Sequence, residues 1–441
     1  MPRHAFFYSF HMKKNEELYE VIIIGGGACG LMAAAELSSN GKKTALLEAM
    51  DRLGGRIYTY TNDSFSSMVE LGAEFIHGDL PITSQILKEE NIQVSKAEGK
   101  MVSFYENIFH NEDLFEKENG DTIKNIYKSL DEDISVSSFI RKYLQGKEQE
   151  ELRYDIIQYV EGYHAADLEK ASSFGLLKDF FSGEDVNYRI DGGYGSVIDH
   201  LHKKIINGNC NIFLSQPVME IIREKDRLIV KTNSSEFLTK KVLITISLGC
   251  LQKETIKFSP ALPEITTAAK KLGYGAVIKL VLEFHSPFWL QARHQDLSKM
   301  LFVFSGEKIP TWWTQYPRKE NTLTGWFAGP DAYKENKTAD QEMMDMGIQS
   351  LSSIFDQPVS ELNDNLKTAR VANWVSNPYI NGGYAYEVVG GDQWKSVIMK
   401  PIENRIFFAG EALQEGSETG TVEAALNSGK KVAELIVEML K

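Results

Sequence analysis

A glycine-rich segment near the start of the chain has the residue types and the spacing needed to bind a dinucleotide. Gly25, Gly27 and Gly30 form the pattern G-x-G-x-x-G. The first glycine permits a tight turn, the second lets the backbone approach a pyrophosphate, and the third lets a helix pack closely on a strand. Glu48 follows at about the 20-residue spacing expected for a carboxylate that accepts ribose hydroxyls.

The segments around these glycines indicate a strand–helix–strand unit. Residues 21–24 are a β-branched run typical of a buried strand, residues 31–37 are rich in helix formers, and residues 44–48 form a second strand. A helix that begins at the glycines would direct its free N–H groups toward the phosphates. An acid at the end of the second strand argues against the 2′-phosphate of NADP and leaves FAD and NAD open.

The composition is that of an ordinary globular protein with an acidic balance. The chain has 441 residues, of which 43% are hydrophobic and 25% charged, and its net charge is −13. This length favours two domains, and the negative charge disfavours nucleic acid as a partner and favours cationic ligands. Cys29, Cys210 and Cys250 are too widely spaced for a metal motif or a disulfide framework, so we expect no metal and a reducing, cytoplasmic location. No apolar run of about 18 residues occurs, so no membrane span is expected.

The pattern of strands and helices predicts an α/β fold in which a second domain is inserted into the dinucleotide domain. The second domain is mostly helical in its first part, where apolar residues recur at three- and four-residue spacing, and contains an apolar strand around Lys279 in its second part. The predicted divisions are a leader at 1–18, the dinucleotide domain at 19–79, 183–252 and 396–441, and the substrate domain at 80–182 and 253–395.

Taken together, the motifs make the sequence similar to the flavin-dependent amine oxidases and, within them, to the polyamine oxidases. The resemblance covers the chain from Tyr19 to the C-terminal helix and rests on eight blocks in the family's order. It implies FAD as the cofactor, a FAD-binding Rossmann-like domain of the monoamine-oxidase type, and an inserted α+β substrate domain. The blocks are the strand–helix–strand unit, 51–56, 71–78, 191–194, 244–249, the Lys279 strand, 374–386 and 407–423.

The resemblance assigns cofactor contacts to residues that are spread over the whole chain. It implies that Glu48 holds the adenosine ribose, that Arg56 and the glycine loop contact the pyrophosphate, and that the backbone at Val218 meets the adenine. Glu411 would lie near the ribityl–phosphate chain, and the helix N-terminus at Thr421 would stabilise negative charge on the flavin. The implied FAD contacts are Gly25, Gly27, Ala28, Cys29, Gly30, Glu48, Ala49, Arg52, Gly55, Arg56, Gly72, Ala73, Glu74, Phe75, Val218, Trp374, Gly410, Glu411, Thr421 and Val422.

Four residues are implied on the substrate side of the flavin. The resemblance places Lys279 against flavin N5 through a water and makes Tyr384 one aromatic wall beside the substrate nitrogen. The other wall of monoamine oxidases corresponds to Thr421, which leaves room for a chain to pass. His77 matches the histidine of the polyamine-oxidase Ile-His-Gly motif, and Gly383 stands where monoamine oxidases bond the flavin to a cysteine, so noncovalent FAD is expected. From the residues alone, two other interpretations stay open: Lys279 could be an edge-strand lysine, and His77 could be a loop histidine bonded to backbone.

These features predict a FAD-dependent amine oxidase that acts on a polyamine or an acetylated polyamine. In the implied reaction, hydride passes from the carbon beside a neutral nitrogen to flavin N5, water hydrolyses the imine, and molecular oxygen is reduced to hydrogen peroxide. The alternatives are an L-amino-acid oxidase or a monoamine oxidase of the same superfamily, and a flavin-binding interaction module without turnover. An amino-acid oxidase needs an arginine that faces the flavin, for which Arg189 is a candidate. The oligomeric state is left open.

Overall fold

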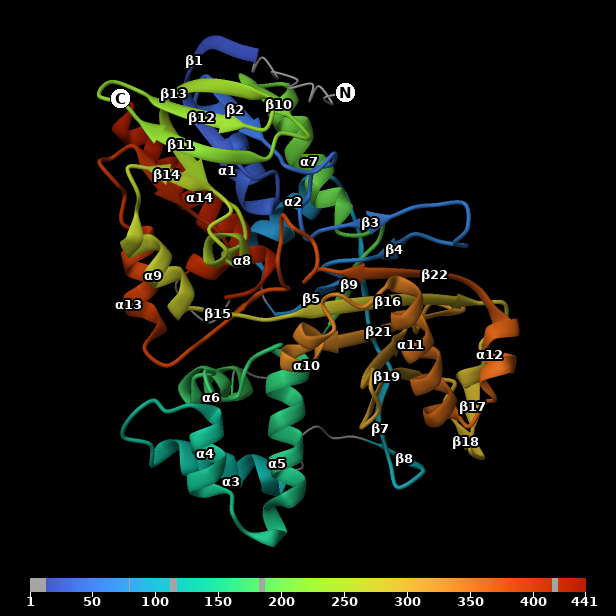
Figure 1. Ribbon diagram of the computed structural model, residues 1–441. Coiled ribbons are helices and arrows are strands. Elements are labelled where there is room, and N and C mark those ends of the chain that lie inside the picture. Colours follow the sequence, from blue (N-terminus) through green and yellow to red (C-terminus); the bar gives the residue numbers. More distant parts are fainter. Residues whose placement is uncertain (1–12, 79, 112–116, 182–186, 415–418) are drawn as a thin grey trace, which may run out of the picture.

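The computed structural model describes residues 13–78, 80–111, 117–181, 187–414 and 419–441. Two large β-sheets and a separate group of helices make up the molecule (Figure 1). The first sheet lies at the top in this view, the second sheet at the lower right, and the helical group at the lower left. This arrangement sets three bodies of structure around a common centre.

The first sheet has eight strands and is built around the predicted strand–helix–strand unit. β1 (Lys13–Ile24) lies between β2 (Thr44–Leu47) and β13 (Ser235–Ile244) and is parallel to both. α1 (Ala28–Ser39) connects β1 to β2, which confirms the predicted unit. The other strands are β10 (Cys210–Phe213), β11 (Val218–Arg223), β12 (Leu228–Thr232), β14 (Lys257–Ser259) and β24 (Ile406–Phe408).

Both faces of this sheet are buried, which explains its continuously apolar strands. Val21 and Ile23 of β1 pack into a core with helices on one side, while Ile22 and Ile24 pack into a second core on the other. The first core includes α1, α7 (Gly195–Ile206) and α14 (Val422–Met439), and the second includes the β11–β13 meander, α8 (Leu248–Gln252), α9 (Pro263–Lys271) and α13 (Gly391–Met399).

The second sheet has seven strands, and its most buried strand carries the predicted catalytic lysine. β16 (Val277–Phe284) is buried along its whole length and lies between β22 and β21. Because side chains alternate along a strand, Ile278 and Leu280 enter the apolar core beneath α11 and Lys279 faces the opposite way. Lys279 is therefore not an edge-strand lysine. The other elements are β22 (Leu366–Asn373), β21 (Thr322–Ala328), β20 (Thr311–Thr314), β19 (Met300–Ser305), β7 (Lys100–Tyr105), β8 (Ile108–Asn111), α10 (Gly329–Lys334), α11 (Asp340–Phe355) and α12 (Val359–Asn365).

Short strands fill the space between the two sheets and position several predicted site residues. Glu74 lies in the turn between two of them, and Glu70 ends another. The pairs are β3 (Thr59–Tyr60) with β4 (Val69–Glu70), β5 (Phe75–Ile76) and β6 (Val94–Lys96) with β9 (Tyr188–Ile190), and β15 (Gly273–Tyr274) with β23 (Ala385–Tyr386).

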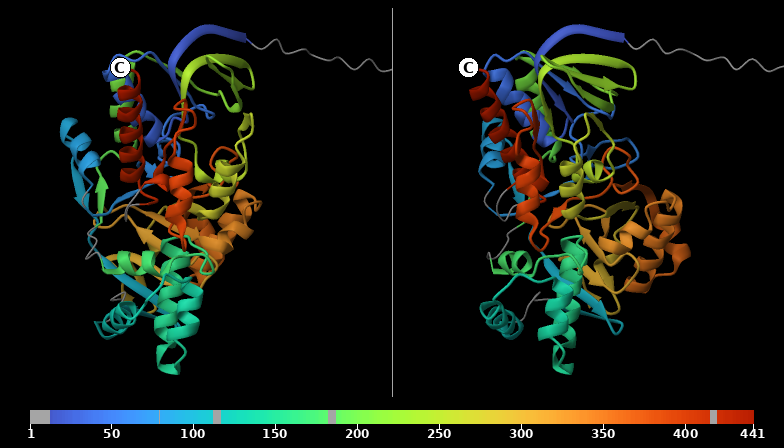
Figure 2. Two further views of the ribbon diagram at one scale, coloured as in Figure 1. Left: turned by 90° about the vertical axis from the view of Figure 1, so that its left-hand side faces the viewer. Right: turned by 60° about the vertical axis from the view of Figure 1, so that its left-hand side comes forward.

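The helical group has its own apolar core, to which Phe139, Leu152 and Val160 belong. The views in Figure 2 show it at the opposite end of the molecule from the C-terminus of α14. Within the described residues, no helix is both long enough and apolar enough to cross a membrane. The helices are α3 (Lys117–Lys128), α4 (Val136–Tyr143), α5 (Glu150–Ile157) with its π-helical continuation Gln158–Tyr163, and α6 (Ser173–Phe181).

The start of the fold differs from the predicted boundary. Residues 13–15 pair with residues 235–237, so the predicted leader 1–18 extends too far into the fold. This extension of β1 was not predicted because residues 13–17 are polar and the apolar run begins only at Tyr19. Residues 1–12 lie outside the described residues.

Two further boundaries were also predicted wrongly. α2 (Pro81–Glu89) packs against α7 and α14, and Glu423 accepts hydrogen bonds from the N–H groups of Ile82 and Thr83, so α2 belongs with the first sheet. Residues 257–271 also belong there, because β14 pairs with β11 and α9 enters the second core. The segment 80–182 contains strands β6, β7 and β8 in addition to its helices.

Gly30 is predicted to be required for the fold itself. A Cβ added there would lie 1.9 Å from the Gly25 carbonyl oxygen and 2.7 Å from the Thr245 hydroxyl oxygen. Gly30→Ala should therefore lower the free energy of unfolding by more than about 3 kcal/mol, as severe overpacking does. The matched control is Gly306→Ala at an exposed turn with nothing within 4 Å, which should change it by less than about 0.5 kcal/mol. Equal urea midpoints for the two variants would contradict this packing role.

Candidate active site

One cavity of about 2000 Å³ brings together nearly all of the predicted site residues. It is lined by the glycine-rich loop, by the ends of strands of the first sheet, by one face of the second sheet and by the helical group. Lys279, Tyr384, Thr421 and His77 all contribute to its wall. Of the predicted cofactor residues, Gly30 and Arg52 do not line the cavity, and every other one does.

The glycine-rich end has the form of a nucleotide cradle. Gly27 is the N-cap of α1 and provides no side-chain cap, so the first turn of α1 opens onto the cavity with its N–H groups uncapped by a side chain. A Cβ at Gly27 would meet only the Gly54 carbonyl oxygen, at 3.9 Å. The space in front of this turn is therefore free for a ligand that carries phosphate groups.

Glu48 stands at the end of β2 beside the same loop. Its carboxylate accepts hydrogen bonds from the N–H of Gly26, at 2.6 Å, and from the N–H of Met50, at 2.7 Å. Burial raises the pKa of Glu48, and these two N–H groups act against that rise. Each carboxylate oxygen keeps a lone pair for a further donor, as a ribose hydroxyl would require.

Arg52 and Gly30 contact other parts of the protein and do not line the cavity, which corrects two predicted cofactor contacts. The Arg52 guanidinium donates to the carbonyl oxygens of Leu53, Gly55 and Ile57 and lies 3.8 Å from the ring centroid of Tyr58. These contacts hold the loop that carries Arg56. Gly30 allows α1 to approach the backbone of Gly25.

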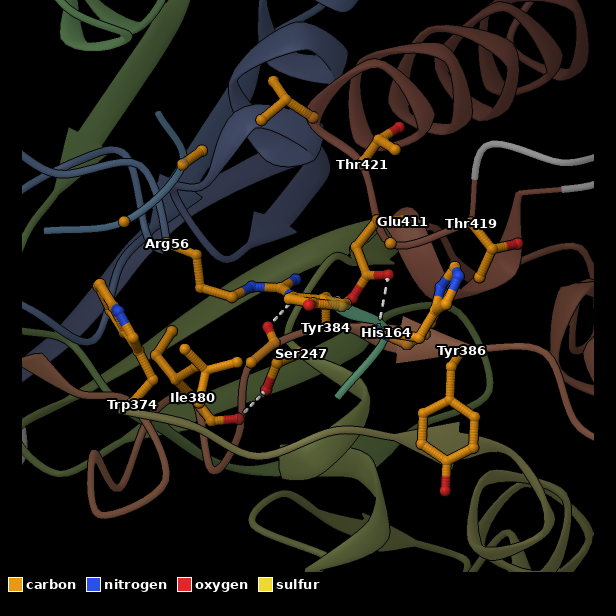
Figure 3. A pocket seen from close by; sticks show the side chains of 18 of the residues that line it. Arg56, His164, Ser247, Trp374, Ile380, Tyr384, Tyr386, Glu411, Thr419 and Thr421 are labelled. Carbon is orange, nitrogen blue, oxygen red and sulfur yellow. Dashed lines mark hydrogen bonds and ion pairs between the residues drawn. The ribbon is translucent and has the colours of Figure 1, made fainter. Parts of the chain in front are cut away.

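Arg56 is half-buried and forms an ion pair with the buried Glu411 that connects three segments of the cavity wall. Its Nη1 lies 2.7 Å from Oε1 of Glu411 and 2.7 Å from the Gly383 carbonyl oxygen (Figure 3). Glu411 also accepts a hydrogen bond from the N–H of Ala385. Burial alone would lower the pKa of Arg56, but Tyr274 and Glu411 outweigh it and raise that pKa, so the guanidinium carries a full positive charge.

An aromatic wall surrounds Tyr384. Its ring stacks on Trp326, with centroids 6.3 Å apart and planes at 22°, and its hydroxyl donates to the Tyr163 carbonyl oxygen. His77 lies on this side too, with its ring centroid 6.1 Å from that of Tyr163. Burial raises the pKa of Tyr384, which keeps the phenol neutral. Thr421 caps α14 by accepting the N–H of Ala424 at 3.0 Å.

Lys279 is held by a carboxylate that the sequence analysis assigned to the cofactor. Its side chain is 1% exposed, and its ammonium lies 2.8 Å from Oε2 of Glu74 and 3.2 Å from the Gly72 carbonyl oxygen. Burial acts against the charged form of Glu74, but Lys279 and Arg189 outweigh it and lower its pKa to about 2. Glu74 is therefore a carboxylate at every physiological pH.

Arg189 belongs to the same buried cluster and does not face the cavity. Its Nε donates to Oε1 of Glu74 at 3.0 Å, and its two terminal nitrogens donate to the carbonyl oxygens of Thr314 and Tyr316. The residue is 5% exposed and does not line the cavity. The predicted candidate for binding a substrate carboxylate is therefore wrong, because the guanidinium is buried against Glu74 and two backbone carbonyls, away from the cavity.

The far end of the cavity carries a group of acids that we call the acidic mouth: Glu106, Glu150, Glu151 and Asp155. Glu106 follows β7, and the other three lie on α5. Tyr105 and Tyr154, also in the lining, are 47% and 48% exposed, so this end opens to the surface. These positions were not predicted individually. The available signal was the presence of three acids and Tyr154 on one helix that borders an aromatic segment, 158–164.

Glu70 generates a prediction about pH. Its Oε1 accepts hydrogen bonds from Tyr194 and Thr59, while Oε2 is buried without a hydrogen-bond partner among the described residues. Burial raises the pKa of Glu70 from 4.5 to about 7. A raised pKa means that the stability contributed by the protonated form is complete below about pH 4.5 and is lost as the pH rises to about 7.

Glu70→Gln mimics the protonated acid and keeps an oxygen for both donors. Near pH 4.5 the variant should match the wild type, and at pH 8 it should be more stable by about 3 kcal/mol. Denaturation of both proteins at several pH values tests this. A difference in stability that stays constant between pH 4.5 and pH 8 would contradict it.

Comparison with known proteins agrees with this site. The chain matches the family described as flavin containing amine oxidoreductase over residues 28–437. Polyamine oxidase 5 of Oryza sativa subsp. japonica is 27% identical over 96% of this chain and 88% of that protein. Lysine-specific histone demethylase 1 homolog 3 of Arabidopsis thaliana is 26% identical over 96% of this chain, which spans only 30% of that longer protein.

Solved structures show the same fold. Putrescine oxidase bound to putrescine is 18% identical with a TM-score of 0.77, covering 96% of this chain and 99% of that one. Cyclohexylamine oxidase from Brevibacterium oxydans IH-35A is 19% identical with a TM-score of 0.76, covering 96% and 100%. The chain belongs to the flavin containing amine oxidoreductase family, has the α/β fold of its FAD-dependent oxidases, and uses FAD as its cofactor.

Proposed function

We propose that this protein oxidises a polyamine or an acetylated polyamine with FAD and molecular oxygen. The proposal rests on one cavity whose wall combines the nucleotide cradle, the Tyr384 wall and the acidic mouth. A polyamine is a flexible apolar chain with several separated positive charges. Its chain suits the aromatic section, and its outer charges suit the carboxylates.

The cradle fits FAD. The uncapped first turn of α1 and the positive charge of Arg56 suit the pyrophosphate, Glu48 suits the ribose, and the backbone at Val218 borders the space for the adenine. The N-terminus of α14 at Thr421 would offer its dipole to the flavin ring. Bound FAD supplies the acceptor for the hydride that leaves the carbon beside the amine nitrogen, and it passes the electrons to oxygen.

The aromatic wall controls the charge of the reacting nitrogen. A free aliphatic amine has a pKa of about 10.4, and only the neutral form releases hydride from its neighbouring carbon. The rings of Tyr384 and Trp326 provide an apolar surface that disfavours the charged form of that nitrogen. The outer nitrogens remain charged, because the carboxylates of the acidic mouth compensate them.

Lys279 provides the polar group beside this wall, because its partner across the β16–β21 pair is Trp326. Its ammonium has three N–H donors, and the contacts to Glu74 and Gly72 use two of them. The third is available to a water in the cavity that Lys279 lines. We assign this group to holding that water and to supplying a proton from Nζ while oxygen is reduced.

The alternatives agree less well with the residues present. The arginine in the cavity lining is Arg56, and it is paired with Glu411, so a substrate carboxylate has no free guanidinium among the described lining residues. A compact aromatic amine is best held between two aromatic walls, whereas Thr421 occupies the second position. An interaction module without turnover does not account for an ammonium buried at the wall of a flavin-sized cavity.

The acidic mouth should act on binding and not on chemistry. Each exposed ion pair contributes up to about 1 kcal/mol, so Glu150→Gln, Glu151→Gln and Asp155→Asn together should raise KM for spermine by about tenfold with little change in kcat. KM for benzylamine should not change. Peroxide production with both amines measures these constants.

The matched control is Asp131→Asn with Glu132→Gln, because these exposed acids lie in the same helical group but do not line the cavity. This control should leave both amines unaffected. A parallel rise in KM for benzylamine, or better turnover of benzylamine or an L-amino acid than of every polyamine tested, would refute the proposed substrate class.

A further inference from the structure

The buried carboxylate of Glu74 has a role that its position beside the cofactor site does not by itself suggest. It lies in the turn between β4 and β5, and its two oxygens are used differently. Oε1 accepts hydrogen bonds from three donors, which are Nε of Arg189, Nε1 of Trp313 and Nε2 of Gln315, at 3.0, 3.0 and 3.2 Å. Oε2 accepts the ammonium of Lys279 at 2.8 Å.

The three donors on Oε1 come from two segments that are hydrogen-bonded to each other, since Arg189 also donates to the carbonyl oxygens of Thr314 and Tyr316. Arg189 lies on β9, which pairs with β5 and β6, and Trp313 lies on β20 in the second sheet. A carboxylate fixed at one oxygen by three donors has its second oxygen fixed in direction as well. Lys279, whose side chain has four rotatable carbons, is thereby held at one point, 5.2 Å from the Trp313 ring centroid.

We propose that Glu74 is a positioning residue that fixes the ammonium of Lys279, in its charged form, at the cavity wall. The inference rests on the role proposed above for Lys279 in the reduction of oxygen. Glu74 thus acts through Lys279 rather than as a contact of FAD. The charged or titratable groups around the pair are Arg189 on β9 and Glu70 on β4, the latter close enough for its own titration to respond to Lys279 and Glu74.

The chain contains a matched pair for comparison on the same strand. Glu283, at the other end of β16, is also buried and lies 2.8 Å from the ammonium of Lys367, and it accepts hydrogen bonds from Ser66. Glu283 does not line the cavity. Glu283→Gln therefore removes from β16 a buried carboxylate that is paired with an exposed lysine, without touching the site.

The test measures oxidation of photochemically reduced holoenzyme by oxygen in a stopped-flow instrument, so no amine substrate is needed. Lys279→Met should slow reoxidation by about 100-fold, the lower part of the range for a positioned proton-transfer group. Glu74→Gln should slow it to a similar extent, and the double variant should be no slower than either single one. Glu283→Gln should react like the wild type.

A second readout follows the ammonium without turnover. The ¹³Cε resonance of Lys279 in lysine-labelled protein is assigned by its absence from Lys279→Met. In Glu74→Gln this resonance should shift and broaden relative to the wild type, because the carboxylate that holds the ammonium at one point is gone. The pH profile of the reoxidation rate should change in Glu74→Gln and should stay that of the wild type in Glu283→Gln.

If the Glu74→Gln variant does not fold, Glu74→Asp can replace it, because it keeps the negative charge. Its shorter side chain retains an anion for Arg189 but withdraws from Lys279, so it should slow reoxidation too. Two results would overturn the role of Glu74 while leaving that of Lys279 intact. One is a reoxidation rate in the Glu74→Gln/Lys279→Met double variant that is reduced by the product of the two single effects. The other is a wild-type reoxidation rate in Glu74→Gln and Glu74→Asp. Unchanged reoxidation in Lys279→Met would overturn both this inference and the proposed role of Lys279, while leaving the substrate class to the amine comparison.

Discussion

The ion cluster of Glu74, Lys279 and Arg189 is the interaction on which the arrangement of the site depends. Two cations and one carboxylate are removed from water at the junction of the two sheets. Removing one partner from such a buried group costs about 3–5 kcal/mol, because the remaining charges lose their compensation. The cluster therefore fixes the second sheet against the β4–β5 turn, and the cavity between the sheets acquires one defined shape.

The rest of the site is formed by the parts of the two sheets and of the helical group that border this cavity. Parallel strands of the first sheet bring the glycine-rich loop and Glu48 to one edge, and the uncapped start of α1 faces that edge. The Arg56–Glu411 pair closes the wall beside it. The helical group, together with Glu106 after β7, supplies the open end, where the acidic mouth lies.

Local patterns predicted the parts of this site that are local in sequence. The strand–helix–strand unit was recognisable because its turn, helix and acid lie within one short segment. The apolar run around Lys279 predicted a strand, but alternation alone does not distinguish an edge strand from a central one. Only the pairing with β21 and β22 shows that Lys279 is buried.

Contacts between distant segments could not be predicted from the pattern. Glu74 and Lys279 are 205 residues apart, and nothing in either segment indicates the other. Arg52 and Arg56 look equivalent in sequence, yet backbone carbonyls engage the first and a carboxylate engages the second. The helix α9 was assigned to the wrong domain because its burial depends on strands that lie far away in the chain.

In the proposed function, the cavity delivers a neutral polyamine nitrogen to FAD. Anaerobic mixing of the wild-type holoenzyme with spermine, N-acetylspermine, benzylamine and L-amino acids, followed by the flavin absorbance, tests it without the oxidative step. We expect fast bleaching by at least one polyamine, with a rate that rises between about pH 7 and pH 9 as the amine loses a proton. Bleaching by benzylamine or an L-amino acid that exceeds that by every polyamine would contradict it.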